Sequence, residues 1–253
     1  SFDLDARLNE TLGNALTDSE LEEFQVAILK QAREIVSLQN SFQWATSMIS
    51  TLDKSATDFR FFGNLELSED NVRFVISKII DEGTVPFAIL ARHGFVAKSI
   101  LDSLVSTGIF SPEEKEMFVN SVSTVAGDFL NDAQRLKSKA MSRNIFLTRY
   151  GHLRPGTYEI SSQRYDQMAN FEEMFMSNEG PNYRPPSNWN PSFKQISLIE
   201  SRLKDFGFDF GAEALLNYIS QSITQREYAK FVFTKHLSNL LESIAKHFEN
   251  FGA

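Results

Sequence analysis

Apolar residues recur at intervals of three and four positions over most of the chain, which is the spacing of a helix with one buried face. The first clear case predicts a helix over 19–38, and Thr17 followed by Glu20 supplies the capping box that starts it. Further helices are predicted over 44–52, from Ser68 to a terminating Gly83, over 192–206 and over 211–248. The pattern therefore indicates an all-α protein.

The stretch 86–105 is apolar on nearly every side, and Pro86 suits a first helical turn. A helix without a polar face is normally surrounded by other helices, so we expect helical neighbours around this one. Within it, Arg92, His93 and Lys98 allow two interpretations. Their side chains either reach the surface or point into a polar cavity that holds an anion.

A clear helix start lies at Ser111, and the apolar stripe that follows continues towards Tyr150, either uninterrupted or with a break. Gly151 then occupies the position of a C-terminal cap. The segment 151–191 holds five of the seven prolines, and its aromatic residues favour an ordered, packed loop. We predict a single helical domain over 1–253, built as a multi-helix bundle with a long ordered loop insert at 151–191.

Two polar turns interrupt the apolar face of the last predicted helix. At about 100° per residue, Glu227, Lys230 and Thr234 fall on the same face as Leu216. One interpretation is an internal pair between Glu227 and Lys230, with Thr234 bonded to its own backbone. The other is that these turns line a site and orient Arg226 or a ligand.

The composition narrows the classes of partner. The chain has 253 residues, a formal net charge of -8 and no cysteine. Binding to nucleic acid needs a basic face, so this acidic balance argues against such a partner. No segment has the roughly 20 apolar residues of a membrane span, and the first residues do not form a signal peptide. We expect a soluble, cytoplasmic protein that does not bind membranes, and the absence of an initiator methionine suggests an excised domain or a processed N-terminus.

Familiar catalytic and metal-binding motifs are either absent or misleading. The D-F-G triplets at 205–207 and 209–211 lack the glycine-rich and catalytic loops of a protein kinase, so we interpret them as turns between helices. The sequence contains no phosphate-binding loop, nucleophile elbow or H-E-x-x-H helix. The four histidines stand far apart without carboxylates at ligand spacing, so no metal site is predicted.

Candidate chemistry gathers in the stretch from Tyr150 to Tyr165, which reads Y-G-H-L-R-P-G-T-Y-E-I-S-S-Q-R-Y. It carries three tyrosines, two arginines and one histidine within sixteen residues and follows a strongly helical segment. If the chain binds a small molecule, we expect the site here.

This stretch resembles the central-domain motif of the phosphoenolpyruvate synthase and pyruvate phosphate dikinase superfamily, which includes rifampicin phosphotransferase. Three other stretches agree with the family in order: P-F-A-I-L-A-R-H-G-F at 86–95, S-V-S-T-V-A at 121–126 and R-E-Y-A-K-F-V-F-T-K-H-L-S at 226–238. The similarity is greatest to members of surface-polysaccharide biosynthesis such as the capsular L-glutamine kinase.

The resemblance implies a kinase with three parts. An ATP-grasp domain, which uses ATP and Mg, phosphorylates a mobile histidine domain, and the phosphohistidine exchanges its phosphoryl group with a substrate held elsewhere. The chain matches neither outer part, so the resemblance makes it the helical middle domain that binds a small-molecule acceptor, L-glutamine or a related amide in capsule biosynthesis. The implied partners are the ATP-grasp and phosphohistidine domains of the same chain, and this part alone should hold no cofactor or catalytic residue and be inactive.

An acceptor with a carboxylate needs a cationic clamp, for which arginine offers a planar fork. His152 either bonds this acceptor or ties down the turn after Gly151. The alternative function is a non-catalytic helical scaffold, in which the loop is an interface for neighbouring domains. The residues expected to bind the acceptor are Arg92, His152, Arg154, Tyr158, Arg164, Tyr165, Arg226, Glu227 and Lys230.

Overall fold

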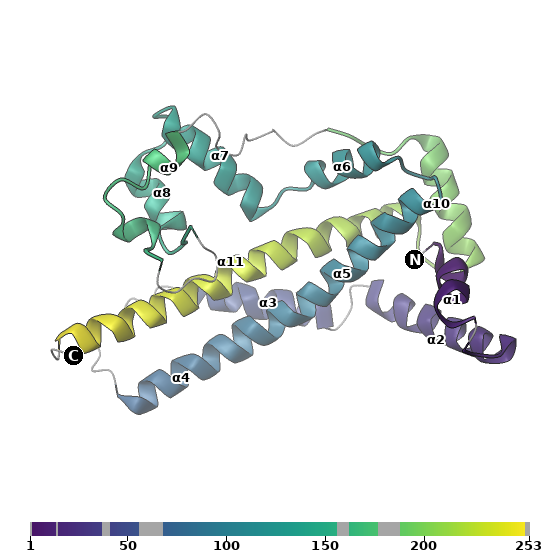
Figure 1. The fold of residues 1–253 in the computed structure, drawn as a ribbon, viewed down its shortest axis with the longest axis horizontal. Helices are drawn as coiled ribbons and strands as arrows, with labels where there is room; N and C mark the ends of the chain where they lie inside the picture. Colours follow the sequence, from purple (N-terminus) through teal and green to yellow (C-terminus); the bar gives the residue numbers. More distant parts are fainter. Residues whose placement is uncertain are drawn as a thin grey trace. The chain divides into compact units, whose positions relative to one another are not determined.

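The fold is that of a computed structural model, which describes residues 2–13, 15–36, 41–55, 68–155, 162–176 and 188–250. All regular structure in these ranges is helical and none of it is a strand, so the predicted all-α, multi-helix class is confirmed (Figure 1). Two parts of the predicted loop insert, 156–161 and 177–187, lie outside the described residues. Among the described helices, none has both the length and the apolar character that crossing a membrane requires.

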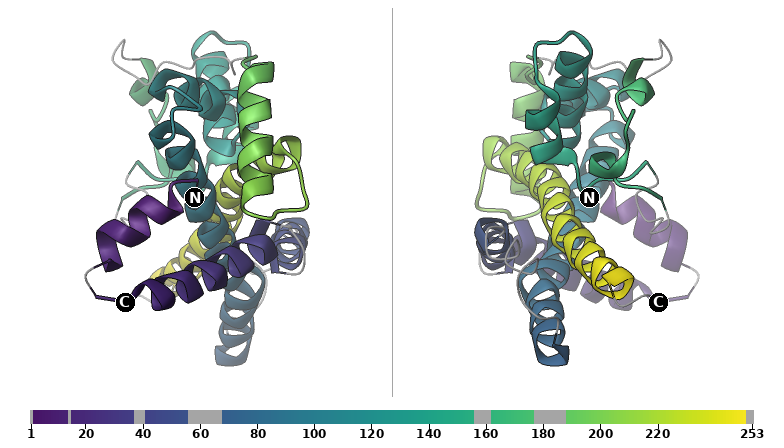
Figure 2. Two further views of the ribbon diagram at one scale, coloured as in Figure 1. Left: turned by 90° about the vertical axis from the view of Figure 1, so that its right-hand side faces the viewer. Right: turned by 90° about the vertical axis from the view of Figure 1, so that its left-hand side faces the viewer.

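The chain divides into two compact units. Unit 1 comprises 1–46, 88–122 and 186–226, and unit 2 comprises 47–87, 123–185 and 227–253. Three helices contribute residues to both units, and the right-hand view of Figure 2 shows the longest of them, α11, as one continuous helix coloured from green to yellow. These three are α3 (Ser41–Lys54), α5 (Val85–Ser106) and α11 (Ala212–Asn250).

Unit 1 contains helices that begin where their capping residues predict. The backbone N–H of Thr17 donates to Glu20 Oε2 at 2.8 Å, and Ser192 and Gln195 form a second capping box. An apolar core that includes Leu101, Phe110, Ile199, Leu203, Leu215, Tyr218 and Ile219 holds the unit together. Besides its parts of α3, α5 and α11, the unit contains α1 (Leu4–Leu12), α2 (Asp18–Val36), α6 (Pro112–Ser121) and α10 (Phe193–Asp205).

The polar residues of α5 divide between surface and core. Arg92 and Lys98 are exposed, and Lys98 Nζ donates to Asp102 Oδ2 at 2.6 Å, which supports the surface interpretation for both. His93 is buried instead, with Nδ1 3.2 Å from the hydroxyl of Tyr218. The burial of His93 is therefore compensated by a protein hydrogen bond.

In unit 2, the prediction that a helix ends at Gly83 is wrong. Helix α4 (Glu69–Ile79) continues through a π-helical turn, η2 (Ile80–Thr84), directly into α5. A Cβ at Gly83 would lie 2.9 Å from Phe233 Cβ, so the glycine permits close packing and does not end the helix. Pro86 follows this turn, and the wider spacing of a π-helical turn tolerates a residue that cannot donate a backbone hydrogen bond.

The stretch 111–150 is interrupted, as one of the two predicted alternatives had it. Helix α6 ends at Ser121, and α7 (Val125–Lys137) begins with the hydroxyl of Thr124 as its cap, at 3.2 Å from the Gly127 nitrogen. Helix α8 (Arg143–Tyr150) follows in unit 2 with its own serine cap. The short helices η3 (Tyr165–Gln167) and α9 (Glu173–Met176) complete the described elements of that unit.

Candidate functional site

The predicted site lies in unit 2, where the chain turns after α8. Two backbone hydrogen bonds close the loop: Asp166 N donates to Gly151 O at 3.1 Å, and Tyr165 N donates to Leu153 O at 2.9 Å. Gly151 follows α8 as its C-cap, as predicted, but in the right-handed conformation (φ -57°). A Cβ there would lie 2.9 Å from Asp166 Cβ, so the glycine allows the two sides of the loop to meet.

Arg164 fixes this loop to α11. Its buried guanidinium forms a two-point contact with Asp166, with Nε 3.0 Å from Oδ1 and Nη2 2.6 Å from Oδ2. Nη1 donates to Asn239 Oδ1 at 3.0 Å and, more weakly, to the Ser238 carbonyl at 3.4 Å. The fork that was predicted to hold an acceptor carboxylate thus already holds a protein carboxylate.

His152 is enclosed by the same loop. Its side chain is buried, its ring lies edge-on to Phe231 with centroids 4.9 Å apart, and its carbonyl accepts a hydrogen bond from Ser238 Oγ at 3.2 Å. Within the described part of the chain, Nε2 has no hydrogen-bond partner. The backbone of His152 thus helps to tie down the turn, whereas its ring nitrogen Nε2 is buried and makes no hydrogen bond within the described residues.

The electrostatic surroundings of His152 are positive. Burial lowers the pKa of His152 to about 3, and the charges of Lys235, Arg164 and His236 lower it further in the same direction. Burial, with the charge of Lys235, also lowers the pKa of His236, to about 4. Both imidazoles are therefore neutral near pH 7. We refer to His152, Arg164, Lys235 and His236 as the His152 cluster.

A carboxylate, Asp53, borders this cluster. Asp53 Oδ2 accepts a hydrogen bond from the Tyr228 hydroxyl at 2.7 Å, and Asp53 Oδ1 lies 3.8 Å from Lys235 Nζ. Burial, followed by the bond to Asp53, raises the pKa of the Tyr228 hydroxyl. The contact with Lys235 is long for an ion pair, whereas the contact with Tyr228 is short. Tyr228 is therefore the firmer partner of Asp53.

The remaining loop residues of the predicted site have different surroundings. Arg154 is half-buried and donates from Nη1 to the carbonyl of Ser162. Tyr165 is buried in an aromatic core, with its ring centroid 6.2 Å from that of Phe129 and 5.8 Å from that of Phe175. Tyr158 lies outside the described residues.

The predicted helical residues are distributed over both units. Arg92 and Arg226 belong to unit 1, where Arg226 lies over the Phe95 ring at 5.6 Å from its centroid. Glu227 and Lys230 are half-buried in unit 2, and the Lys230 carbonyl accepts from Thr234 Oγ1 at 2.7 Å. The bond of Thr234 to its own backbone, which belongs to the first of the two interpretations, is confirmed. A pocket lining shared by the arginines remains a prediction.

The sequence did not reveal the buried carboxylate of Asp132. Tyr150 donates to Asp132 Oδ2 at 3.1 Å and Arg149 donates to the same oxygen at 2.7 Å, while Arg135 donates to Oδ1 at 3.1 Å. These three donors satisfy the carboxylate, which joins α7 to α8. Asp132 is a structural residue, and only its position on an apolar helix face could have signalled its burial.

The buried face of α11 also differs from the predicted one. At about 100° per residue, Leu237 falls within about 60° of Leu216 on the predicted apolar face, yet it is 40% exposed, whereas the adjacent His236 is fully buried. The most deeply buried positions of this helix are Ala212, Leu215, Tyr218, Ile219, Ser222, Ala229, Val232, His236 and Leu240. A polar residue among apolar ones is a weak sequence signal, so periodicity alone does not reveal the burial of His236.

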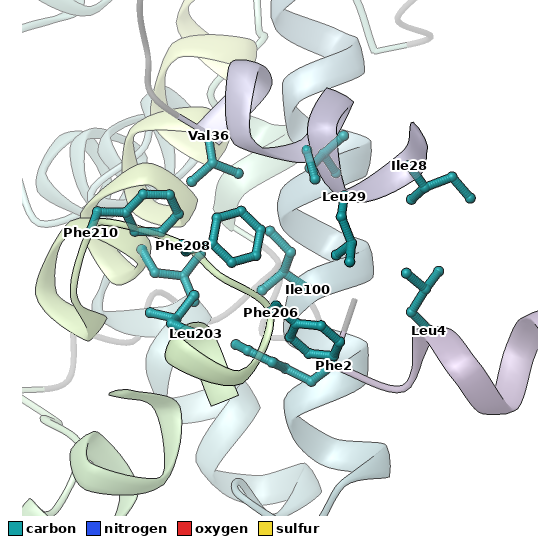
Figure 3. A pocket seen from close by; sticks show the side chains of 13 residues that line it. Phe2, Leu4, Ile28, Leu29, Val36, Ile100, Leu203, Phe206, Phe208 and Phe210 are labelled. Carbon is teal, nitrogen blue, oxygen red and sulfur yellow. The ribbon is translucent and has the colours of Figure 1, made fainter. Parts of the chain in front are cut away.

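Unit 1 contains an apolar cavity of about 70 Å³ that the sequence did not predict. The two D-F-G turns supply part of its wall, because their phenylalanines alternate with exposed residues and point inward together (Figure 3). Gly207 adopts φ +68°, which confirms its interpretation as a turn glycine. The aromatic residues of the wall are Phe2, Phe206, Phe208 and Phe210, and its aliphatic residues include Leu4, Ile28, Leu29, Val36 and Ile100.

Over the described ranges, no group of three or more histidine, aspartate or glutamate residues could hold a metal ion. Comparison of the chain with protein-family models, with curated proteins and with solved structures finds no match.

Proposed function

We propose that the chain is the acceptor-binding helical domain of an ATP-dependent phosphotransferase that works through a phosphohistidine. Four stretches that resemble the phosphoenolpyruvate synthase and pyruvate phosphate dikinase superfamily, in order along the chain, support this proposal. The acceptor class is L-glutamine or a related amide, and the setting is cytoplasmic capsule biosynthesis. ATP and Mg act in the parent enzyme, whose ATP-grasp and phosphohistidine domains are the partners of this one.

The observation that carries the proposal is the state of His152. The stretch that resembles the family motif fixes its own backbone through bonds at Gly151, His152 and Leu153, yet among the described residues its buried imidazole nitrogen Nε2 has no hydrogen-bond partner. Buried polar atoms normally have partners, so a buried nitrogen without one marks a place where a water molecule or a polar ligand atom can bind.

The scaffold function is the second candidate, and the surroundings of Arg164 favour it. Its guanidinium contacts Asp166, Asn239 and Ser238, which is what a residue with a purely structural role would do. In that case the loop serves to hold neighbouring domains. The two functions differ in one respect, because only the first requires a small molecule to bind.

A ligand screen distinguishes the two candidates. Thermal unfolding of the chain is followed with L-glutamine, L-asparagine, pyruvate and glucose, and again with the Arg154→Ala variant. The proposal predicts that an amino acid amide raises the melting temperature of the wild type and not that of the variant. No shift with any of the four compounds would favour the scaffold.

A further inference from the structure

The main chain on both sides of His152 is held in place. Gly151 O and Leu153 O accept backbone hydrogen bonds from Asp166 and Tyr165, and the carbonyl of His152 itself accepts from a side chain of α11. The ring is packed against Phe231, and only 6% of the residue is exposed. The position of the imidazole is therefore set by a fixed main chain and by its contact with Phe231.

The charges around the ring determine which kind of ligand atom suits it. Lys235 and Arg164 are the cations whose charges lower the pKa of His152, and both oppose a further positive charge. Arg164 is paired with Asp166 and Lys235 has a long contact with Asp53, while His236 is neutral near pH 7. A metal cation is therefore disfavoured, and an oxygen atom with negative charge is favoured. The neutral imidazole can donate one hydrogen bond to such an oxygen.

Lys235 is better placed than Arg164 to supply a positive charge to a ligand. The guanidinium of Arg164 is engaged by Asp166 and Asn239, and its side chain is 9% exposed. Lys235 has a long contact of 3.8 Å with Asp53, and its side chain is 24% exposed. Its flexible stem allows the ammonium group to move towards a ligand at low cost.

We propose that His152 and Lys235 form an oxyanion subsite, in which Nε2 and Nζ bind a carboxylate or phosphoryl oxygen. The inference rests on the proposed function in one respect, because the oxyanion would be the carboxylate of the acceptor or the phosphoryl group of its product. Oxyanion binding itself is measurable without turnover. Phosphate and L-glutamine are the probes for the two sources.

The test follows the imidazole resonances of the ¹⁵N-histidine-labelled chain by NMR during titration with inorganic phosphate and, separately, with L-glutamine. The four histidines are assigned with single variants to glutamine, and His93 is the internal control because it lies in unit 1 and is bonded to Tyr218. The subsite predicts a saturable shift of the His152 signal with at least one probe and no shift of the His93 signal.

Two lysine variants distinguish binding at a specific site from non-specific electrostatic attraction of the anion. Lys235→Met should weaken the binding of the active probe about tenfold, because a nearby positive charge is lost. Lys246→Met is the matched control, since Lys246 lies on the same helix and its side chain is 68% exposed in a pair with Glu242. The net charge of -8 makes non-specific attraction of anions weak, which sharpens the comparison.

Each outcome has one meaning. If neither probe moves the His152 signal, or if both lysine variants weaken binding equally, the subsite is wrong. If L-glutamine stabilises the chain while neither probe moves the His152 signal, the subsite is wrong and the proposed function stands. If phosphate binds at His152 while every acceptor fails in the ligand screen, the subsite stands and the proposed function fails. His152→Gln need not fold for these conclusions, because Lys235→Met tests the same site.

Discussion

Arg164 and Asp166 form a two-point ion pair inside the stretch that was expected to bind the acceptor, with Nη2 2.6 Å from Oδ2. The side chain of Arg164 is 9% exposed, whereas that of Asp166 is 36% exposed. The pair therefore orients the more buried partner and links the loop to α11 through Asn239. Because its guanidinium is occupied by Asp166 and Asn239, Arg164 holds the loop in place, and His152 is the residue of the loop that we propose to contact a ligand.

Replacement of Arg164 by methionine should lower the free energy of unfolding by about 2 kcal/mol, because hydrogen bonds from a charged, buried donor are lost. Arg73→Met is the control in the same unit. Arg73 also pairs with a carboxylate, Glu69, but its side chain is 74% exposed, so the change should cost under about 1 kcal/mol. Urea unfolding measures both, and equal costs would show that the Arg164 pair is not structural.

The stability of unit 2 should depend on pH through the His152 cluster. The pKa values of His152 and His236 in the folded state, about 3 and about 4, lie below the ordinary value of 6.5. The unfolded chain therefore binds more protons below pH 6.5, and the stabilisation present above that pH is lost as the pH falls from about 6.5 towards 4. The slope approaches about 1.4 kcal/mol per pH unit for each histidine.

Urea unfolding at pH 7, 6 and 5 tests this dependence, and a His236→Gln variant should show a shallower slope over the same range. A wild-type free energy of unfolding that stays constant between pH 7 and pH 5 would contradict the burial of both neutral imidazoles. The window lies above the titration of ordinary carboxylates, which separates the two effects.

Gly83→Ala should destabilise unit 2 by about 1–3 kcal/mol, because the new Cβ would meet Phe233 Cβ at 2.9 Å and Leu52 Cδ2 at 3.0 Å. Gly127→Ala is the matched control within helix α7, where the nearest atom is Thr124 Oγ1 at 3.6 Å. That change should be neutral or stabilising, since alanine favours helix. Thermal unfolding by circular dichroism compares the two, and a stable Gly83→Ala would refute the close packing.

Filling the cavity in unit 1 should raise stability. A cavity of about 70 Å³ costs on the order of 1–2 kcal/mol, and Ala32 on α2 contributes to its wall. Ala32→Leu should recover about 1 kcal/mol, as judged by urea unfolding. Phe208→Ala, which enlarges the same cavity, should have the opposite effect. Destabilisation by both changes would show that the space is not available to a side chain.

Local signals made most of the fold predictable. The helices at 19–38, 86–105, 192–206 and 211–248 were predicted to within a few residues, because capping boxes and apolar periodicity act within a few turns. The predicted helix end at Gly83 was wrong, because the role of this glycine depends on its packing against Phe233, which is distant in sequence. A glycine that permits close packing has the same sequence signature as one that ends a helix.

The contacts of the candidate site were harder to predict from the sequence than the helices. The loop and its histidine were identified from the density of polar and aromatic residues, but the partners of Arg164 and the burial of His236 depend on tertiary contacts. Arg154 and Arg164 have equivalent signatures in sequence, yet Asp166 contacts only the second through both oxygens. Which of the two arginines pairs with Asp166 is set by the folded loop and not by the sequence around each residue.

The account depends most directly on whether the chain binds an acceptor through His152. Isothermal titration of the wild type and of Lys235→Met with L-glutamine, at pH 7 and low salt, measures this. We predict one saturable site per chain, with affinity about tenfold lower in the variant. Absence of binding by the wild type to L-glutamine and to the other acceptors, or equal affinity of the two proteins, would contradict it.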